Sequence, residues 1–234
     1  MSWTYLVPTT LDMYGSMSGS SVWMMAATWD TRYFALVFLM WCVMMVGMML
    51  PSAAPMILLF AQVAQRSARA EAPIARTYAF AGGYLVTWTA FSLAATILQS
   101  LLAGAALMSP MMEYTSTTIG ALTLMAAGIY QWTPLKRLCL IHCRSPLHWL
   151  SHSWRPGIGG ALRMGASHGV YCVGCCWMLM LLLFFGGVMN LTWIALIAGF
   201  VLLEKLAPFG ARIGRIGGAL LVAAGIGLLV SPPS

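Results

Sequence analysis

The sequence predicts an all-α, polytopic membrane protein with about six transmembrane helices, and three observations support this fold class. Hydrophobic residues make up 61% of the chain and charged residues only 7%, whereas soluble domains carry roughly 25% charged residues. The apolar residues form runs long enough to cross a bilayer, which takes about 20 residues per helix. Basic residues cluster in the short segments between these runs, as the positive-inside rule predicts for cytoplasmic loops.

The net charge of +7 does not indicate binding to nucleic acid, because the basic residues are divided among short loops and do not follow one solvated face. Residues 1–30 contain no basic residue, so we expect no cleavable signal peptide there. We expect residues 1–31 to form an extracytoplasmic tail with an interfacial helix. Residues 32–234 would form the six-span transmembrane domain.

The first apolar run, residues 33–64, would measure about 48 Å as a straight helix, against a hydrocarbon core of about 30 Å. Pro51 and Pro55 predict a break in this long span, because proline removes a backbone donor and clashes with the preceding turn. Further spans are expected at residues 77–107, 116–132, 160–188, about 191–203 and 217–230, with a basic cytoplasmic loop at about 135–160. Six spans with this basic loop in the cytoplasm place both termini outside the cytoplasm.

The fourth span carries the strongest functional signal, a histidine and three thiols within an apolar run. At about 100° per residue, one helix face or its edge carries five soft ligands: Met164, His168, Cys172, Cys175 and Cys176. Ionisable groups at membrane depth are costly and usually mark a functional site. Thiolate, thioether and imidazole together suit Cu(I). The pattern therefore predicts a copper site, with zinc as the second candidate, which would require His168 and the three cysteines to form a tetrahedron on a distorted helix.

One helix rarely completes a metal site, because its side chains point outward in one sector. The chain contains 19 methionines, and four at helical spacing in the first span are predicted to form a relay toward the outer face: Met44, Met45, Met48 and Met49. The predicted loop contains Cys139, His142 and Cys143, a loose metal-binding pattern that we interpret as a cytoplasmic acceptor. In the alternative interpretation, these thioethers and thiols only pack helices together.

Glu204 and Lys205 lie side by side at the end of the fifth span. We expect Glu204 to pair with Lys205 or with a neighbouring arginine at the membrane interface.

The chain contains four dense motifs: Met48-Met49-Leu50-Pro51-Ser52-Ala53-Ala54-Pro55, Tyr130-Gln131-Trp132-Thr133-Pro134-Leu135-Lys136, Cys139-Leu140-Ile141-His142-Cys143-Arg144-Ser145-Pro146 and His168-Gly169-Val170-Tyr171-Cys172-Val173-Gly174-Cys175-Cys176-Trp177. With these motifs the chain resembles, from about Phe34 to Lys205, a bacterial family of unknown function described as predicted metal-binding integral membrane proteins. The resemblance implies a bound metal and a membrane location. It implies no substrate, reaction or ligand set.

We therefore predict a multi-pass protein of the bacterial inner membrane that binds Cu(I) for transport, storage or delivery to a membrane or periplasmic cuproenzyme. Two alternatives stay open: an accessory structural subunit of a larger membrane complex, and a transmembrane thiol–disulfide electron carrier that uses Cys172 and Cys175. The carrier would need an exposed thiolate of low pKa. We expect no enzymatic activity, because the sequence has no phosphate-binding loop and no recognisable serine–histidine–acid set. The expected partners are the lipid bilayer and a cuproenzyme or larger complex.

Overall fold

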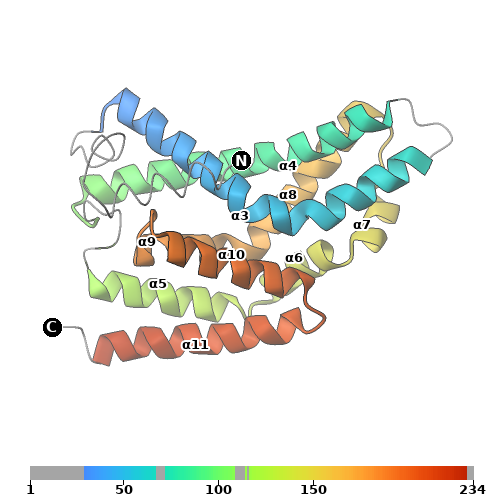
Figure 1. The fold of residues 1–234 in the computed structure, drawn as a ribbon. Helices are drawn as coiled ribbons and strands as arrows, with labels where there is room; N and C mark the ends of the chain where they lie inside the picture. Colours follow the sequence, from blue (N-terminus) through green and yellow to red (C-terminus); the bar gives the residue numbers. More distant parts are fainter. Residues whose placement is uncertain (1–28, 67–71, 109–113, 115, 231–234) are drawn as a thin grey trace.

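The computed structural model describes residues 29–66, 72–108, 114 and 116–230, and within these residues the protein is helical and has no β-strand (Figure 1). The predicted interfacial helix falls almost entirely outside the described residues. The helices are α3 (Thr31–Arg66), α4 (Pro73–Gly104), α5 (Thr117–Tyr130), α6 (Pro134–Arg144), α7 (Pro146–Ser153), α8 (Gly157–Leu181), α9 (Leu183–Gly186), α10 (Leu191–Leu206) and α11 (Gly210–Val230).

Four helical segments in the described part of the chain are long and apolar enough to cross a membrane: Thr31–Arg66, Pro73–Gly104, Gly157–Gly186 and Gly210–Val230. Helices α5 and α10 have 14 and 16 residues, which is shorter than the about 20 residues of an ordinary span. The all-α class with membrane-length helices is thus confirmed. The number of about six spans stays a prediction.

Helix α3 is continuous over 36 residues, with Pro51 and Pro55 inside it. The predicted break is therefore a bend, which Figure 1 shows near the middle of the helix. A proline inside a helix removes one backbone hydrogen bond and kinks the chain without necessarily ending the helix. The Ser52 hydroxyl donates to the carbonyl of Met49 over 2.8 Å at this bend. Ser52 and Ala53, in the turn that follows Pro51, are buried.

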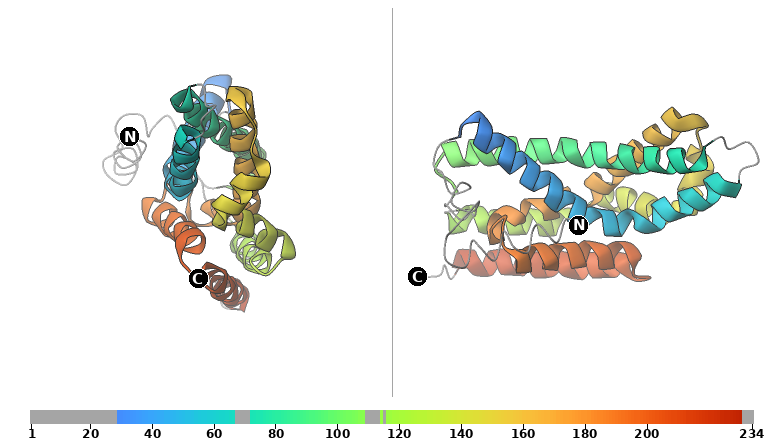
Figure 2. Two further views of the ribbon diagram at one scale, coloured as in Figure 1. Left: turned by 90° about the vertical axis from the view of Figure 1, so that its right-hand side faces the viewer. Right: turned by 45° about the horizontal axis from the view of Figure 1, so that its top comes forward.

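Helices α4 and α8 pack with their backbones almost in contact. A Cβ atom on Gly83 would lie 2.0 Å from the carbonyl oxygen of Leu162, and one on Gly165 would lie 1.8 Å from that of Phe80. Small residues allow this close approach between helices in membranes. Helices α5 and α11 pack side by side at the opposite edge of the bundle, with α6 and α10 between the two groups (Figures 1 and 2).

The segment expected to be a loop at about 135–160 contains helices α6 and α7. The Thr133 hydroxyl caps α6 by accepting a hydrogen bond from the Lys136 amide over 3.3 Å, and Pro134 occupies the first turn, where its missing N–H costs nothing. Helix α6 packs against α8. At the contact, the Cys139 sulfur lies 2.7 Å from the position of a Cβ on Gly174, so only glycine fits there without a shift.

Candidate metal centre

The predicted ligand face of α8 points into the protein. Its members are almost completely buried, from 0% exposed at Cys176 to 3% exposed at His168. The three cysteines belong to one hydrophobic core with residues of α3, α4 and α10. The stripe therefore does not face lipid, and side chains from other helices lie within reach of it.

A cavity of about 180 Å³ lies beside Cys172. Four helices contribute its lining: Ser52, Ala53, Pro55 and Met56 from α3, Cys143 and Arg144 from α6, His168 and Cys172 from α8, and Lys205 and Leu206 from α10. The residues that line this cavity thus include two cysteines, one histidine and one methionine, whose side chains are donor types that suit Cu(I).

The Cys172 thiol is the most strongly contacted of these donors. The Lys205 ammonium lies 2.9 Å from the Cys172 sulfur and 3.1 Å from the Ser52 hydroxyl. The Tyr84 hydroxyl lies 3.1 Å from the same sulfur and 3.2 Å from the Met49 carbonyl oxygen, to which it donates. An adjacent ammonium favours the thiolate, which is the metal-binding form of cysteine.

The other two cysteines of α8 hold a different position. The Cys175 and Cys176 thiols each donate to the Cys172 carbonyl over 3.0 Å, and neither lines the cavity. On α6, Cys139 packs against Gly174, whereas Cys143 lines the cavity. A hydrogen bond with Cys175 and burial together raise the pKa of the Cys143 thiol well above its usual value. Binding of a metal by Cys143 would therefore have to displace the proton of this thiol.

His168 lies in the cavity wall among aromatic rings. Its ring centroid is 5.6 Å from that of Trp149, 6.0 Å from that of Tyr84 and 6.2 Å from that of Phe80. Its Nδ1 atom is buried and has no hydrogen-bond partner among the described residues. Because an unsatisfied buried nitrogen is costly, this atom is suited to hold a ligand.

Met164 does not join this group. Its sulfur accepts a hydrogen bond from the Arg155 amide over 3.2 Å, and it lines a separate cavity with Trp149 and Arg163. The half-buried His142 ring also lies outside the cavity lining: its Nδ1 lies 2.8 Å from the Leu138 carbonyl oxygen and its ring stacks on Tyr171 at 4.3 Å. Of the predicted acceptor residues on α6, Cys143 thus lines the cavity, whereas His142 does not.

The methionines of the predicted relay lie in the same core as the thiols, but they do not line the cavity: Met44, Met45, Met48 and Met49. Met56, which follows the proline bend, does line it. The predicted relay did not include Met56, although it lies seven residues after Met49 and so on nearly the same helix face.

The four predicted ligands of α8 do not form a closed site. Across the described residues, no group of three or more His, Cys, Asp or Glu side chains is placed to hold a metal ion. Structural zinc sites need four such ligands in a tetrahedron, so zinc has no support here. Cu(I) accepts fewer and softer ligands, thioethers included. Cys143, Cys172, His168 and Met56 line one cavity, and their donor types are ones that suit Cu(I), although the three His and Cys side chains are not arranged as a ready-made metal site.

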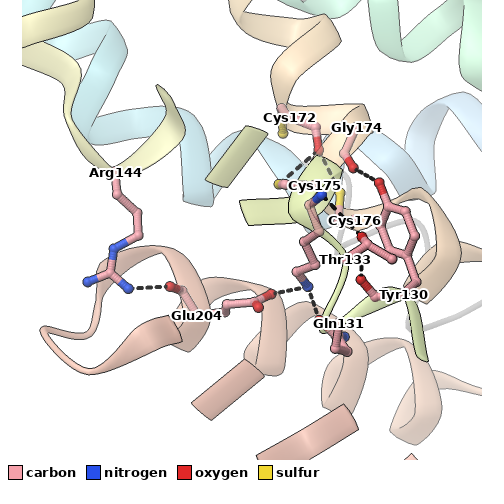
Figure 3. Close-up of polar contacts among 10 residues, drawn as sticks. Tyr130, Gln131, Thr133, Arg144, Cys172, Gly174, Cys175, Cys176 and Glu204 are labelled. Carbon is pink, nitrogen blue, oxygen red and sulfur yellow. Dashed lines mark hydrogen bonds and ion pairs between the residues drawn. The ribbon is translucent and has the colours of Figure 1, made fainter. Parts of the chain in front are cut away.

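Glu204 pairs with Lys136 of α6 and not with Lys205. The Lys136 ammonium lies 2.7 Å from Glu204 Oε2, with both side chains at most 3% exposed, and it also donates to Gln131. Figure 3 shows Glu204 and Gln131 together at this contact, away from Cys172. Neighbouring residues on a helix point about 100° apart, so Glu204 and Lys205 reach different partners. Lys136 lies six residues after Tyr130 in the motif Tyr130–Lys136, and nothing in that motif predicted an ion pair with Glu204.

The fold and the cavity together define a helical protein with membrane-length helices and a buried set of soft metal donors. The chain matches the family model described as "PpoB2: Copper chaperone" over residues 38–228. Because this match covers most of the chain, the protein belongs to this copper chaperone family. The predicted resemblance to a metal-binding family is thus confirmed as far as the relation to a metal, copper, is concerned. No curated protein and no solved structure matches the chain.

Proposed function

We propose that this protein is an integral protein of the bacterial inner membrane that binds Cu(I) in the cavity beside Cys172 and delivers it to a membrane or periplasmic cuproenzyme. The convergence of Cys143, Cys172, His168 and Met56 on one cavity carries the proposal. Membership of a copper chaperone family supports copper as the cargo. A carrier of this kind needs binding and release but no chemical conversion, so we propose no enzymatic activity.

The two thiols are the primary ligands in this proposal, with His168 and Met56 as further donors. Metal binding requires deprotonated cysteines, and Lys205 stabilises the Cys172 thiolate at 2.9 Å. Cys143 and Cys172 lie on different helices, α6 and α8. A small displacement of α6 would therefore remove one thiolate ligand and weaken the site, which gives the protein a way to release its cargo.

The basic residues support an orientation for the chain in the membrane. The end of α3, the start of α4 and the turn between α10 and α11 lie at one end of the bundle (Figure 1), and they carry Arg66, Arg76 and Arg212. The positive-inside rule assigns this end to the cytoplasm. Both termini would then lie outside, and the methionines Met44, Met45, Met48 and Met49 would extend from the cavity toward the outer face.

The test is Cu(I) binding by the detergent-purified protein in the presence of a competing Cu(I) chelator. We expect the wild type to bind stoichiometric Cu(I) and the Cys143→Ser/Cys172→Ser variant to lose it. Cys42→Ser is the matched control, because Cys42 is also a free cysteine of a membrane-length helix but does not line the cavity. Equal copper binding by the wild type and the double variant would contradict the proposal and favour a structural role for the thiols.

A further inference from the structure

We propose that Lys205 makes the cavity selective for a monovalent over a divalent metal ion, by supplying one fixed positive charge beside the two thiolates. This inference rests on the proposed function, in which Cys143 and Cys172 hold Cu(I). It adds a residue that is not itself a ligand, and it would let a site rich in thiols favour Cu(I) over zinc.

The position of Lys205 fits this role. Its ammonium lies 2.9 Å from the Cys172 sulfur and 3.1 Å from the Ser52 hydroxyl, and the side chain is buried in the cavity wall. The neighbouring carboxylate of Glu204 does not neutralise it, because Glu204 already pairs with Lys136 at 2.7 Å. The charge of Lys205 is therefore available to the thiols.

Arg144 is the other cationic residue in the cavity wall, and its charge is directed elsewhere. Its guanidinium donates to the carbonyl oxygens of Glu204 at 3.1 Å, Ala207 at 2.6 Å and Pro208 at 3.0 Å. These carbonyls lie at and just beyond the C-terminal end of α10, which carries a partial negative charge. Arg144 thus offsets the helix end, whereas Lys205 offsets the thiolates.

The selectivity follows from counting charges at the ligands. Two thiolates and one ammonium leave a single negative charge, which Cu(I) neutralises and Zn(II) converts into a net positive charge. Without the ammonium, Zn(II) would give a neutral site and Cu(I) would leave a buried negative charge. An uncompensated charge in a low-dielectric interior is strongly unfavourable, so the presence of Lys205 decides which ion is favoured.

A comparison of the two metals distinguishes a charge effect of Lys205 from simple packing. A lysine that only supported Ser52 or filled space would affect all metals alike, because its loss would loosen the same ligands for each ion. A lysine that acts through its charge must weaken Cu(I) and strengthen Zn(II). The opposite signs of these two changes are the signature of charge compensation.

The experiment measures Cu(I) and Zn(II) dissociation constants, each with a competing chelator, for the purified wild type, Lys205→Gln, Lys205→Met and Lys205→Arg. We expect both neutral variants to lower the preference for Cu(I) over Zn(II) at least about tenfold, since a unit charge at contact distance outweighs this even at an effective dielectric constant near 20. Lys205→Arg, which keeps the charge, should retain most of the preference. Lys205→Gln keeps a hydrogen-bond donor for Ser52 and so controls for loss of that contact.

An unchanged preference in the folded Lys205→Gln protein would overturn this inference, and so would equal weakening of both metals in the two neutral variants. If the wild type binds Cu(I) through Cys143 and Cys172 while its preference survives in these variants, only the role of Lys205 fails. If the wild type binds no Cu(I), the proposed function fails with it.

Discussion

Two lysines are buried in this bundle, and they have different partners. Lys136 of α6 lies against a carboxylate and an amide, those of Glu204 and Gln131. Lys205 of α10 lies against a thiol and a hydroxyl, those of Cys172 and Ser52. Each lysine also lines a cavity, of about 250 Å³ for Lys136 and about 180 Å³ for Lys205.

The comparison indicates that a buried charge and a polar cavity do not by themselves make a copper site. The cavity at Lys136 is lined by amide, carboxylate, guanidinium, indole and aliphatic groups and has no thiol or thioether in its wall. Its ammonium is satisfied by an ion pair that has no soft donor. The cavity at Lys205 combines its ammonium with two thiols, an imidazole and a thioether. We therefore interpret the first as a structural pair that joins α6 to α10, and the second as a receptor for a soft cation.

The largest effect that separates the two lysines should appear in stability. We expect Lys136→Met to lower the free energy of unfolding by about 3–5 kcal/mol, because it leaves Glu204 buried without its partner. Lys205→Met should cost less, about 1–3 kcal/mol, because the Cys172 thiol can remain neutral when its partner is lost. Chemical unfolding in mixed detergent micelles measures both losses.

The double variant Lys136→Met/Glu204→Leu controls for the loss of packing at this pair. Replacing a whole buried ion pair by apolar residues is often neutral or stabilising, so most of the stability should return. If Lys205→Met proves as destabilising as Lys136→Met, the distinction between a structural and a receptive lysine is wrong.

A second prediction concerns how α6 reaches the site. Gly174→Ala would place a methyl group 2.7 Å from the Cys139 sulfur, and we expect this overpacking to cost about 1–3 kcal/mol. Because α6 also carries Cys143, its displacement should weaken Cu(I) binding. Thermal unfolding and a Cu(I) chelator competition measure the two effects.

The matched control for Gly174→Ala is the Gly174→Ala/Cys139→Ala variant, which removes the sulfur that the new methyl group meets. We expect it to recover both stability and Cu(I) binding. A loss of copper that persists after this repair would mean that the contact between α6 and α8 does not position Cys143.

The sequence predicted the parts of this arrangement that depend on one helix. The spacing of His168, Cys172 and Cys175 indicated a buried face, and all three are buried. Ser116 and Asn190 begin α5 and α10 close to the expected boundaries, because each accepts a hydrogen bond from an amide of the first turn. The helical class and the relation to copper also followed from residue types and spacing, whereas the break predicted at the prolines is only a bend in a continuous helix.

The parts that depend on how helices meet could not be predicted. A pattern along one chain cannot tell that Glu204 and Lys205 diverge to Lys136 and Cys172, because each partner lies more than 30 residues away in sequence. It also could not predict that Cys143 lines the cavity while His142 does not, since the direction of α6 depends on the close contact at Gly174.

The smallest effect should come from His142, which sequence spacing had grouped with Cys143. Its ring lies outside the cavity lining and contacts the Leu138 carbonyl and Tyr171, so we expect His142→Ala to leave Cu(I) affinity unchanged. His168→Ala is the matched comparison, because it removes the buried imidazole of the cavity, and it should weaken binding by roughly tenfold, the equivalent of about 1.4 kcal/mol. Chelator competition on both variants measures the difference. If His142→Ala weakens copper and His168→Ala does not, the ligands lie on the outer face of α6, and the soft-donor cavity is only a packing feature of the core.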